Sequence, residues 1–126
     1  MANSIVNSPN APAPIGPYSH SVMAGNTLYI SGQIALDAQS GELINESIEA
    51  ETHQVMKNLQ AILIQAEMSF SDVAKCTIFV KDLNNFGKIN EIYGSYFAFN
   101  PPARETVEVS RLPKDVNVEI SAIAVK

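Results

Sequence analysis

The stretch SVMAGNTLYISGQI, residues 21–34, decides the first part of the fold. It is typical of two short β-strands joined by the two-residue turn Gly25-Asn26, because both residues tolerate a positive φ. The second strand has two alternating sets of side chains, Leu28, Ile30, Gly32 and Ile34 against Tyr29, Ser31 and Gln33. The sequence therefore predicts a β-hairpin at this place.

The period of the apolar residues changes between Ser47 and Ala66. They recur there at steps of four and three, which is the pattern of an amphipathic helix with one buried face. The apolar stripe consists of Ile48, Thr52, Val55, Met56, Leu59, Ile62, Leu63 and Ala66. The acidic residues Glu46, Glu49 and Glu51 near its start favour the positive end of the helix dipole.

The rest of the chain alternates between strands and a second helix. Residues 73–82, VAKCTIFVKD, are rich in β-branched and aromatic residues and predict a strand. Apolar residues between 86 and 97 predict a shorter helix, and two strands follow, one containing Arg104 and one over residues 117–126. Because the helices follow strands, this order predicts an α+β fold, a mixed sheet with two helices packed on one face.

The last strand indicates how the sheet is covered. Its residues Val118, Ile120, Ala122 and Ala124 are expected to meet the helices, opposite Glu119, Ser121, Ile123 and Val125. The second face thus carries apolar residues too, which is unusual for a face in water. Because large apolar patches rarely stay exposed, the sequence predicts a homo-oligomer that covers this face. The alternative is that these strands are short and alternate imperfectly.

Length and composition fit one domain over residues 1–126, with 46% hydrophobic and 17% charged residues. The net charge of −5 disfavours nucleic-acid binding, which needs a basic surface. The start shows no secretory leader, and the longest apolar run, AILI, is far too short for a membrane span. Cys76 is the only cysteine, so we expect a soluble, cytoplasmic protein without a disulfide or a thiolate metal cluster.

Arg104 is the strongest candidate for a binding residue. It follows the rigid pair Pro101-Pro102, and alternation puts it on the same side as Thr106 and opposite Glu105. The strand expected beside it offers Glu119 between two apolar residues, a costly place for a carboxylate unless it is paired or used. Either the two form a structural ion pair, or Arg104 binds a ligand carboxylate while Glu119 handles a water or a proton.

Other polar residues are ambiguous, because a purely structural role fits each of them. Tyr18 fits a core tyrosine, Ser31 fits local backbone bonds, and Gly32 fits either a bulge or a close backbone approach. The sequence contains no glycine-rich phosphate loop, nucleophile elbow or metal motif. This pattern indicates a chemistry that needs no metal, nucleotide or other cofactor.

Four segments carry a resemblance to a known family: IGPYS (15–19), LYISGQI (28–34), TIFVKDLNNF (77–86) and PARETVEVSRLPKDVNVEISAIAV (102–125). They resemble the RidA/YjgF family of reactive-intermediate deaminases. The resemblance implies a chorismate-mutase-like fold and a homotrimer whose sheets form a central barrel, with clefts between subunits. It also implies hydrolysis of 2-imino acids to 2-oxo acids and ammonia. These imines, 2-iminobutanoate and 2-iminopropanoate among them, come from pyridoxal-phosphate dehydratases of amino-acid metabolism, including isoleucine biosynthesis.

The resemblance implies roles for particular residues. The carboxylate-binding arginine of the family falls on Arg104, and the acid that orients or activates water falls on Glu119. The positions that line the substrate cleft fall on Tyr18, Ser31, Gly32, Asn90 and Thr106.

The two residues after Arg104 depart from the serine and cysteine that are common in the family. Thr106 is expected to keep the family's backbone contact to the ligand, and Glu105 is expected to point away from Arg104. The departure motivates a second hypothesis, a non-catalytic regulator of amino-acid metabolism that binds a small molecule in the same cleft. An RNA-directed role is a third hypothesis, and the negative net charge counts against it.

Overall fold

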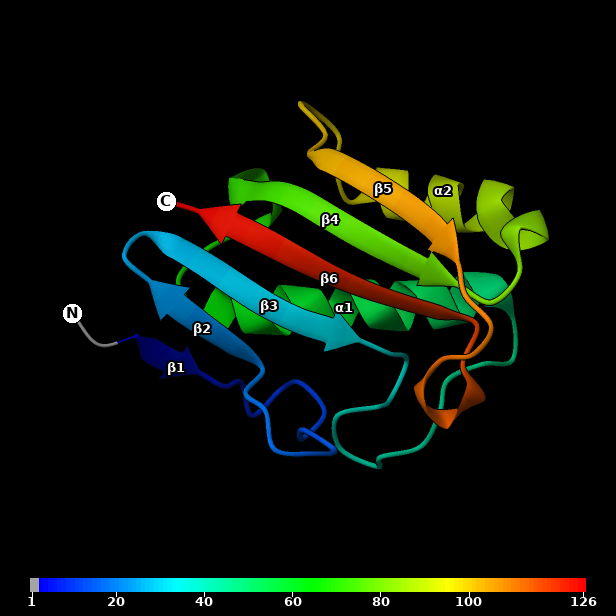
Figure 1. Cartoon of the computed structure of the whole chain (residues 1–126), viewed down its shortest axis with the longest axis horizontal. Helices are drawn as coiled ribbons and strands as arrows, with labels where there is room; N and C mark the ends of the chain where they lie inside the picture. Colours follow the sequence, from blue (N-terminus) through cyan, green and yellow to red (C-terminus); the bar gives the residue numbers. More distant parts are fainter. Residues whose placement is uncertain (1–2) are drawn as a thin grey trace.

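The computed structural model describes residues 3–126 as a six-stranded sheet with two helices (Figure 1). The strands are β1 (Ser4–Val6), β2 (Ser21–Ala24), β3 (Thr27–Gln33), β4 (Val73–Val80), β5 (Ala103–Glu108) and β6 (Val118–Val125). The helices are α1 (Ile48–Gln65) and α2 (Phe86–Ser95). Short 3-10 turns at Phe70–Asp72, Leu83–Asn85 and Pro113–Asp115 come just before β4, α2 and β6.

The strand order in the sheet is β1-β2-β3-β6-β4-β5. Neighbouring strands are antiparallel except β4 and β5, which are parallel and joined by a crossover through α2. Both helices lie behind the sheet in Figure 1, so the predicted mixed sheet with helices on one face is confirmed. The short edge strand β1 was not predicted. Within residues 3–126, no helix is long and apolar enough to cross a membrane.

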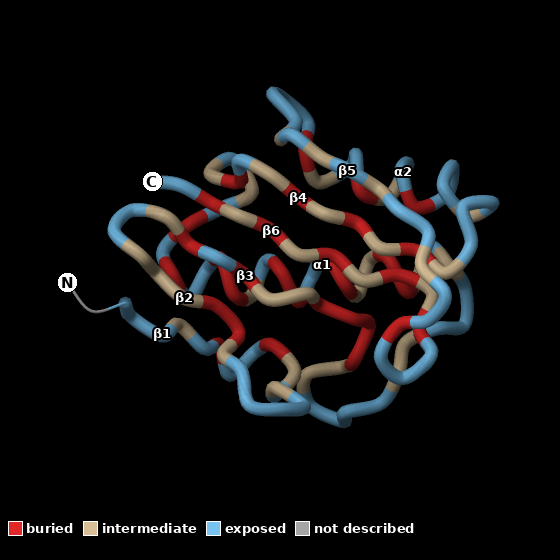
Figure 2. The backbone as a smooth tube through the Cα atoms, viewed as in Figure 1, coloured by how far each residue is buried: buried red, intermediate tan, exposed pale blue. Residues whose placement is uncertain are grey.

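The core lies between the sheet and the helices. All four of the β6 residues predicted to face the helices are buried: Val118, Ile120, Ala122 and Ala124. They share one cluster with the buried stripe of α1, and Figure 2 shows buried and half-buried positions alternating along β6. Burying one large apolar side chain contributes roughly 1.5–3 kcal/mol, so this layer is the main source of stability.

The face of the sheet away from the helices is uncovered and carries apolar as well as polar side chains. Phe79 and Ile123 are half-buried there, whereas Tyr29 and Val107 are exposed. The lack of clean alternation that the sequence indicates is therefore present in the fold.

An extra residue in β3 breaks the predicted alternation. The register of β3 with β6 shifts between Ile30 and Gln33, so that Ser31 and Gly32 oppose a single residue of β6. After this β-bulge Gln33 takes the buried position, and Gly32 faces the uncovered side. The prediction that Gly32 shares a face with Leu28 and Ile30 is wrong for this reason.

The proline-rich segment 9–17 forms an arm without helix or strand, because prolines fix φ and remove backbone donors. His20 ties this arm to the sheet. The backbone N–H of Ser8 donates to Nδ1 of His20 at 3.0 Å, and Nε2 of His20 bonds the carbonyl oxygen of Pro12. The backbone N–H of His20 donates to Oδ1 of Asn7 at 2.8 Å. These bonds use both ring nitrogens and fix the course of the arm beside the end of β3.

Candidate functional site

Glu119, on β6, faces the uncovered side of the sheet and an open cleft. We call this the Glu119 cleft, and it is lined by Ile15, Tyr18, Ser31, Gly32, Ile34, Pro113 and Glu119. The Glu119 side chain is half-buried, and this burial raises the pKa of its carboxyl group. A carboxylate with a raised pKa is a better base than a solvated one, so Glu119 is suited to accept a proton from a nearby water.

Gly32 lies against the side chain of Glu119. A Cβ atom at position 32 would stand 2.8 Å from Cδ of Glu119 and 3.0 Å from its Oε2. Any side chain at position 32 would therefore displace the carboxyl group. The bulge and the close backbone approach, offered by the sequence as alternatives, are both present, because the bulge delivers the Gly32 backbone to this place.

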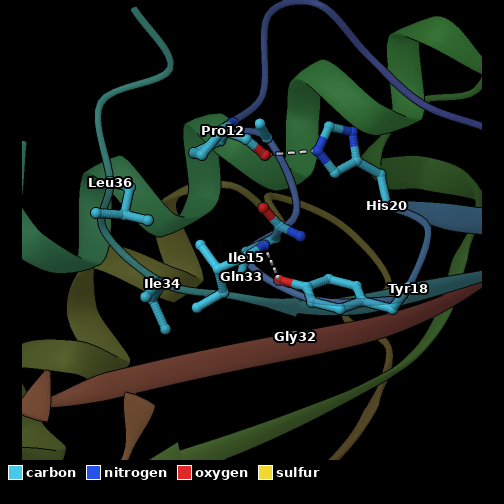
Figure 3. Close-up of a pocket in the computed structure, with 9 residues that line it drawn as sticks. Pro12, Ile15, Tyr18, His20, Gly32, Gln33, Ile34 and Leu36 are labelled. Carbon is cyan, nitrogen blue, oxygen red and sulfur yellow. Dashed lines mark hydrogen bonds between the residues drawn. The ribbon is translucent and has the colours of Figure 1, made fainter. Parts of the chain in front are cut away.

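The N-terminal arm and the residue after it contribute Ile15 and Tyr18 to the lining of the cleft. The hydroxyl oxygen of Tyr18 accepts a bond from the backbone N–H of Ile15 at 3.3 Å (Figure 3). Tyr18 is 45% exposed, so the interpretation of a core tyrosine is wrong. A narrower pocket continues under the arm, where Figure 3 shows Pro12 and Leu36 among its lining residues.

Ser31 joins the arm to β3. Its hydroxyl donates to the carbonyl oxygen of Ser19 at 2.7 Å, and its backbone N–H donates to the carbonyl oxygen of His20 at 2.9 Å. Ser31 does bond to backbone groups, but they lie 12 positions away in the case of its hydroxyl, so the prediction of a purely local bond is wrong. Since the hydroxyl oxygen can still accept hydrogen bonds, Ser31 can also serve the cleft as an acceptor.

Arg104, on β5, faces the other side of the sheet, toward α2. Its Nη1 donates to Oδ1 of Asn90 at 2.6 Å, and its guanidinium carbon lies over the rings of Tyr93 and Phe86, 5.0 and 5.5 Å from their centroids. No acidic side chain in residues 3–126 forms an ion pair with it. Of the five N–H donors of the guanidinium, those not bonded to Asn90 are available for a ligand.

Two buried hydroxyl groups lie on the α2 side of β5. Oγ1 of Thr106 and the hydroxyl oxygen of Tyr93 have no hydrogen-bond partner among the described residues. Burial raises the pKa values of the Tyr93 hydroxyl and the Cys76 thiol beside it. Cys76 is therefore a protonated, buried side chain, and Thr106 shares with Arg104 the face of β5 that is turned to α2.

Arg104 and Glu119 do not meet within one chain. The prediction that their strands adjoin is wrong, because β4 lies between β5 and β6. Arg104 pairs with Cys76 of the buried face, whereas Glu119 pairs with Phe79 of the uncovered face. A structural ion pair between Arg104 and Glu119 of the same chain is thereby excluded. The chain instead carries two half-sites, the Glu119 cleft and the Arg104 half-site, which consists of Asn90, Arg104 and Thr106.

The two half-sites offer complementary chemistry. The Arg104 half-site can hold a small planar carboxylate, since a guanidinium binds such a group with two parallel hydrogen bonds. The Glu119 cleft supplies a base and hydrogen-bonding groups. No group of three or more histidine, cysteine, aspartate or glutamate side chains in residues 3–126 is placed to hold a metal ion.

Comparison with known proteins places these features in a family. Residues 8–126 match the family model described as Endoribonuclease L-PSP. The 2-iminobutanoate/2-iminopropanoate deaminase of mouse is 45% identical over 122 residues, which cover 97% of this chain and 90% of the mouse protein. The YjgF gene product of E. coli superposes with a TM-score of 0.93 at 43% identity over 98% of each chain. This chain belongs to the RidA/YjgF family.

Other members of the family match over the same length. A RutC family protein of Pyrococcus horikoshii is 52% identical over 122 residues, 97% of each chain. E. coli TdcF, solved with bound serine, superposes with a TM-score of 0.94 at 40% identity over 98% of each chain. The RidA/YjgF resemblance carried by the sequence motifs is confirmed, and so is the α+β fold with one sheet and two helices.

Glu105, the residue after Arg104, bonds to side chains of the neighbouring strand β4. Oε2 of Glu105 accepts a hydrogen bond from Oγ1 of Thr77 at 2.7 Å and pairs with Nζ of Lys75 at 3.2 Å. Both contacts lie on the uncovered face of the sheet, so Glu105 points away from the Arg104 guanidinium, as alternation predicts. Glu105 therefore adds no carboxylate to the Arg104 half-site.

Phe86 and Tyr93 were not recognised from the sequence as neighbours of Arg104. They looked only like core residues of the second helix. Their spacing of four before and three after Asn90 puts all three residues on one helix face, and this was the signal that could have found them.

Proposed function

We propose that this protein hydrolyses reactive 2-imino acids, such as 2-iminobutanoate and 2-iminopropanoate, to 2-oxo acids and ammonia, at a site completed by two copies of the chain. The observation that carries the proposal is the placement of an unpaired Arg104 guanidinium and a half-buried Glu119 carboxyl on opposite faces of one sheet. A small substrate cannot contact both groups on a single chain. The mouse relative, named as a deaminase of these imines, supports the same reaction.

A homotrimer would bring the two half-sites together. In a ring of three, each copy presents Arg104 to the Glu119 cleft of its neighbour, and the same contact repeats until the ring closes. The uncovered sheet faces, with Tyr29, Phe79, Val107 and Ile123, would then line a central barrel and leave water. The proposed assembly thus accounts for the apolar residues on that face.

The proposed reaction begins with the substrate carboxylate bound by the fork of Arg104. Glu119, as a carboxylate, orients a water and accepts its proton while the water oxygen bonds to the imine carbon, and the electron pair of the carbon–nitrogen double bond moves to nitrogen. With a protonated imine this gives a neutral carbinolamine, and Glu119 then donates its proton to the amine nitrogen. The carbon–nitrogen bond breaks as the hydroxyl group gives its proton to Glu119 and becomes the carbonyl, and the released ammonia takes that proton and leaves as ammonium. General-base help of this kind contributes roughly 10²–10⁴-fold, which suits a reaction that also proceeds in water.

The other proposed site residues complete this cleft. Tyr18, Ser31 and Gly32 would line the substrate on the Glu119 side, and Asn90 and Thr106 on the Arg104 side. The proposed chemistry uses no cofactor. We propose that the protein acts in the cytoplasm, beside the dehydratases that release such imines in amino-acid metabolism, including isoleucine biosynthesis.

A coupled assay tests the proposal. Threonine dehydratase generates the imine, and adding this protein should accelerate the release of 2-oxobutanoate. Arg104→Lys should keep the trimer and lose most of the acceleration, because lysine cannot form the two-pronged bond. Arg111→Lys, the same change at the other arginine of the chain, is the matched control and should behave as wild type. No acceleration by an intact wild-type trimer would reject the proposal.

Two other functions are tested by separate measurements on the same protein. The description of the family model as an endoribonuclease motivates a test with RNA, although the net charge of −5 is unfavourable for binding it. RNA cleavage without imine turnover would favour that activity. Thermal stabilisation by 2-oxobutanoate without turnover would favour a non-catalytic regulator of amino-acid metabolism.

A further inference from the structure

One face of α2 holds the guanidinium of Arg104. Phe86, Asn90 and Tyr93 are spaced by four and three residues, so their side chains project from the same side of the helix. All three contact Arg104, which comes from β5 and not from their own helix. We call this face of α2 the guanidinium cradle.

Two aromatic rings of the cradle contact Arg104. Phe86 and Tyr93 are seven positions apart, about two turns of an α-helix. The guanidinium carbon is 5.5 Å from the ring centroid of Phe86 and 5.0 Å from that of Tyr93, so it lies over both rings. Asn90, in the middle of the cradle, accepts a hydrogen bond from Nη1 at 2.6 Å.

This arrangement restricts the guanidinium without neutralising it. The negative faces of aromatic rings attract a cation but leave its in-plane N–H donors free. Asn90 contributes a neutral acceptor and therefore no countercharge. Tyr93 is only 4% exposed, so one side of the cradle is rigid and dry, whereas Phe86 is 38% exposed and forms its outer side.

We propose that Phe86 and Tyr93 are positioning residues that set the affinity of Arg104 for a carboxylate ligand. This inference rests on the proposed function, in which Arg104 binds the substrate carboxylate. The two rings fix the plane of the guanidinium, and Asn90 fixes its rotation in that plane. The N–H groups of the guanidinium that are not bonded to Asn90 are thereby oriented before the ligand binds. A guanidinium that is already oriented loses less conformational entropy on binding.

Substitution of the exposed ring gives the first test. Phe86→Leu should raise KM for 2-iminobutanoate, and the inhibition constant of 2-oxobutanoate, by about two- to fivefold with kcat nearly unchanged. The buried ring contributes more, so Tyr93→Leu should raise both constants by about tenfold or more. Phe99→Leu is the matched control for Phe86→Leu. Phe99 is 88% exposed and lies outside the cradle, so its substitution should leave both constants unchanged.

Conservative variants separate positioning from general stability. Phe86→Tyr and Tyr93→Phe keep a ring at each place and should restore KM to within about twofold of wild type. The Tyr93 hydroxyl has no partner among the described residues, so its removal should leave the guanidinium contact intact. If Tyr93→Phe instead weakens binding as much as Tyr93→Leu, the ring is not what positions Arg104, and the inference fails.

A chemical probe tests the cradle independently of turnover. Arg104 and Arg111 are the two arginines of the chain, and 2,3-butanedione modifies accessible guanidinium groups. Phe86→Leu and Tyr93→Leu should each raise the modification rate of Arg104 relative to Arg111 by about twofold or more, as mass spectrometry measures it. An unchanged ratio would overturn the inference. Failure of the imine assay with a changed ratio would reject the proposed function and leave the cradle standing.

Discussion

Gly32 determines the position of the Glu119 carboxyl by having no side chain. A Cβ at position 32 would lie 2.8 Å from Cδ of Glu119 and 3.0 Å from both Cγ and Oε2. The bulge in β3 puts the glycine at this contact, so a local irregularity of the sheet sets the geometry of the Glu119 cleft.

Gly32→Ala should therefore reduce activity far more than stability. The new methyl group pushes the flexible Glu119 side chain aside, and a displacement of about 1 Å in a reacting group can cost roughly 10²-fold in rate. We expect kcat/KM in the coupled assay to fall by about that factor, with little change in Tm. Gly94→Ala is the matched control, because nothing lies within 4 Å of a Cβ at position 94. Wild-type kcat/KM for Gly32→Ala would contradict the account.

Glu119→Gln should stabilise the fold at neutral pH while abolishing turnover. Burial raises the pKa of Glu119 in the folded protein above its ordinary value of 4.5. Between these two pKa values the folded state binds more protons than the unfolded state, so stability falls as the pH rises through this window. Glutamine carries no charge and avoids this loss.

Thermal unfolding across pH checks the prediction. Tm of Glu119→Gln should exceed that of the wild type at pH 7, and the difference should shrink as the pH falls below 4.5. A variant less stable than the wild type at pH 7 would contradict the prediction, because it would mean that other groups of the protein stabilise the charged form of Glu119.

Glu51 ties α1 to the start of β6, and Glu51→Gln should weaken this link. The carboxylate is fully buried and accepts bonds from the backbone N–H groups of Asn117 at 2.7 Å and Val118 at 3.2 Å, and from the Asn117 side chain at 2.8 Å. A glutamine nitrogen cannot accept, so a buried donor loses its partner. The free energy of unfolding should fall by about 2 kcal/mol.

Denaturant unfolding of Glu51→Gln and Glu49→Gln measures this effect. Glu49 is exposed two residues away in the same helical turn, so the control removes an equivalent charge from the helix start. It should cost no more than about 1 kcal/mol. Equal losses in the free energy of unfolding for the two variants would contradict the prediction, because they would mean that Glu51 acts only through the helix dipole.

The elements with regular periodicity could be predicted, because one period fixes which side chains are buried. The stripe between Ser47 and Ala66 forms α1, with Ser47 as its N-cap. Glu51 could not be placed in this way. Its position near the helix start predicts only a favourable interaction with the helix dipole, and the bonds from residues 117 and 118, at the start of the distant β6, explain its burial.

The site was harder to predict than the fold. Alternation along β5 correctly separated Arg104 from Glu105, since it depends on local geometry alone. It could not give the order of the strands, so it missed that β4 separates Arg104 from the strand of Glu119. Gly32 allowed a bulge as one of two interpretations, but the sequence does not show whether the strand has an extra residue, so the side that Gly32 faces came only from the structure.

Mixing two inactive variants tests the central claim most directly, namely that each site takes Arg104 from one copy and Glu119 from another. Arg104→Lys and Glu119→Gln chains are unfolded together in equal amounts, refolded and assayed for imine hydrolysis. In randomly mixed trimers an intact Arg104 meets an intact Glu119 at about one quarter of the contacts, so about a quarter of wild-type activity should return. Mixed trimers that stay as inactive as either variant alone would contradict the account.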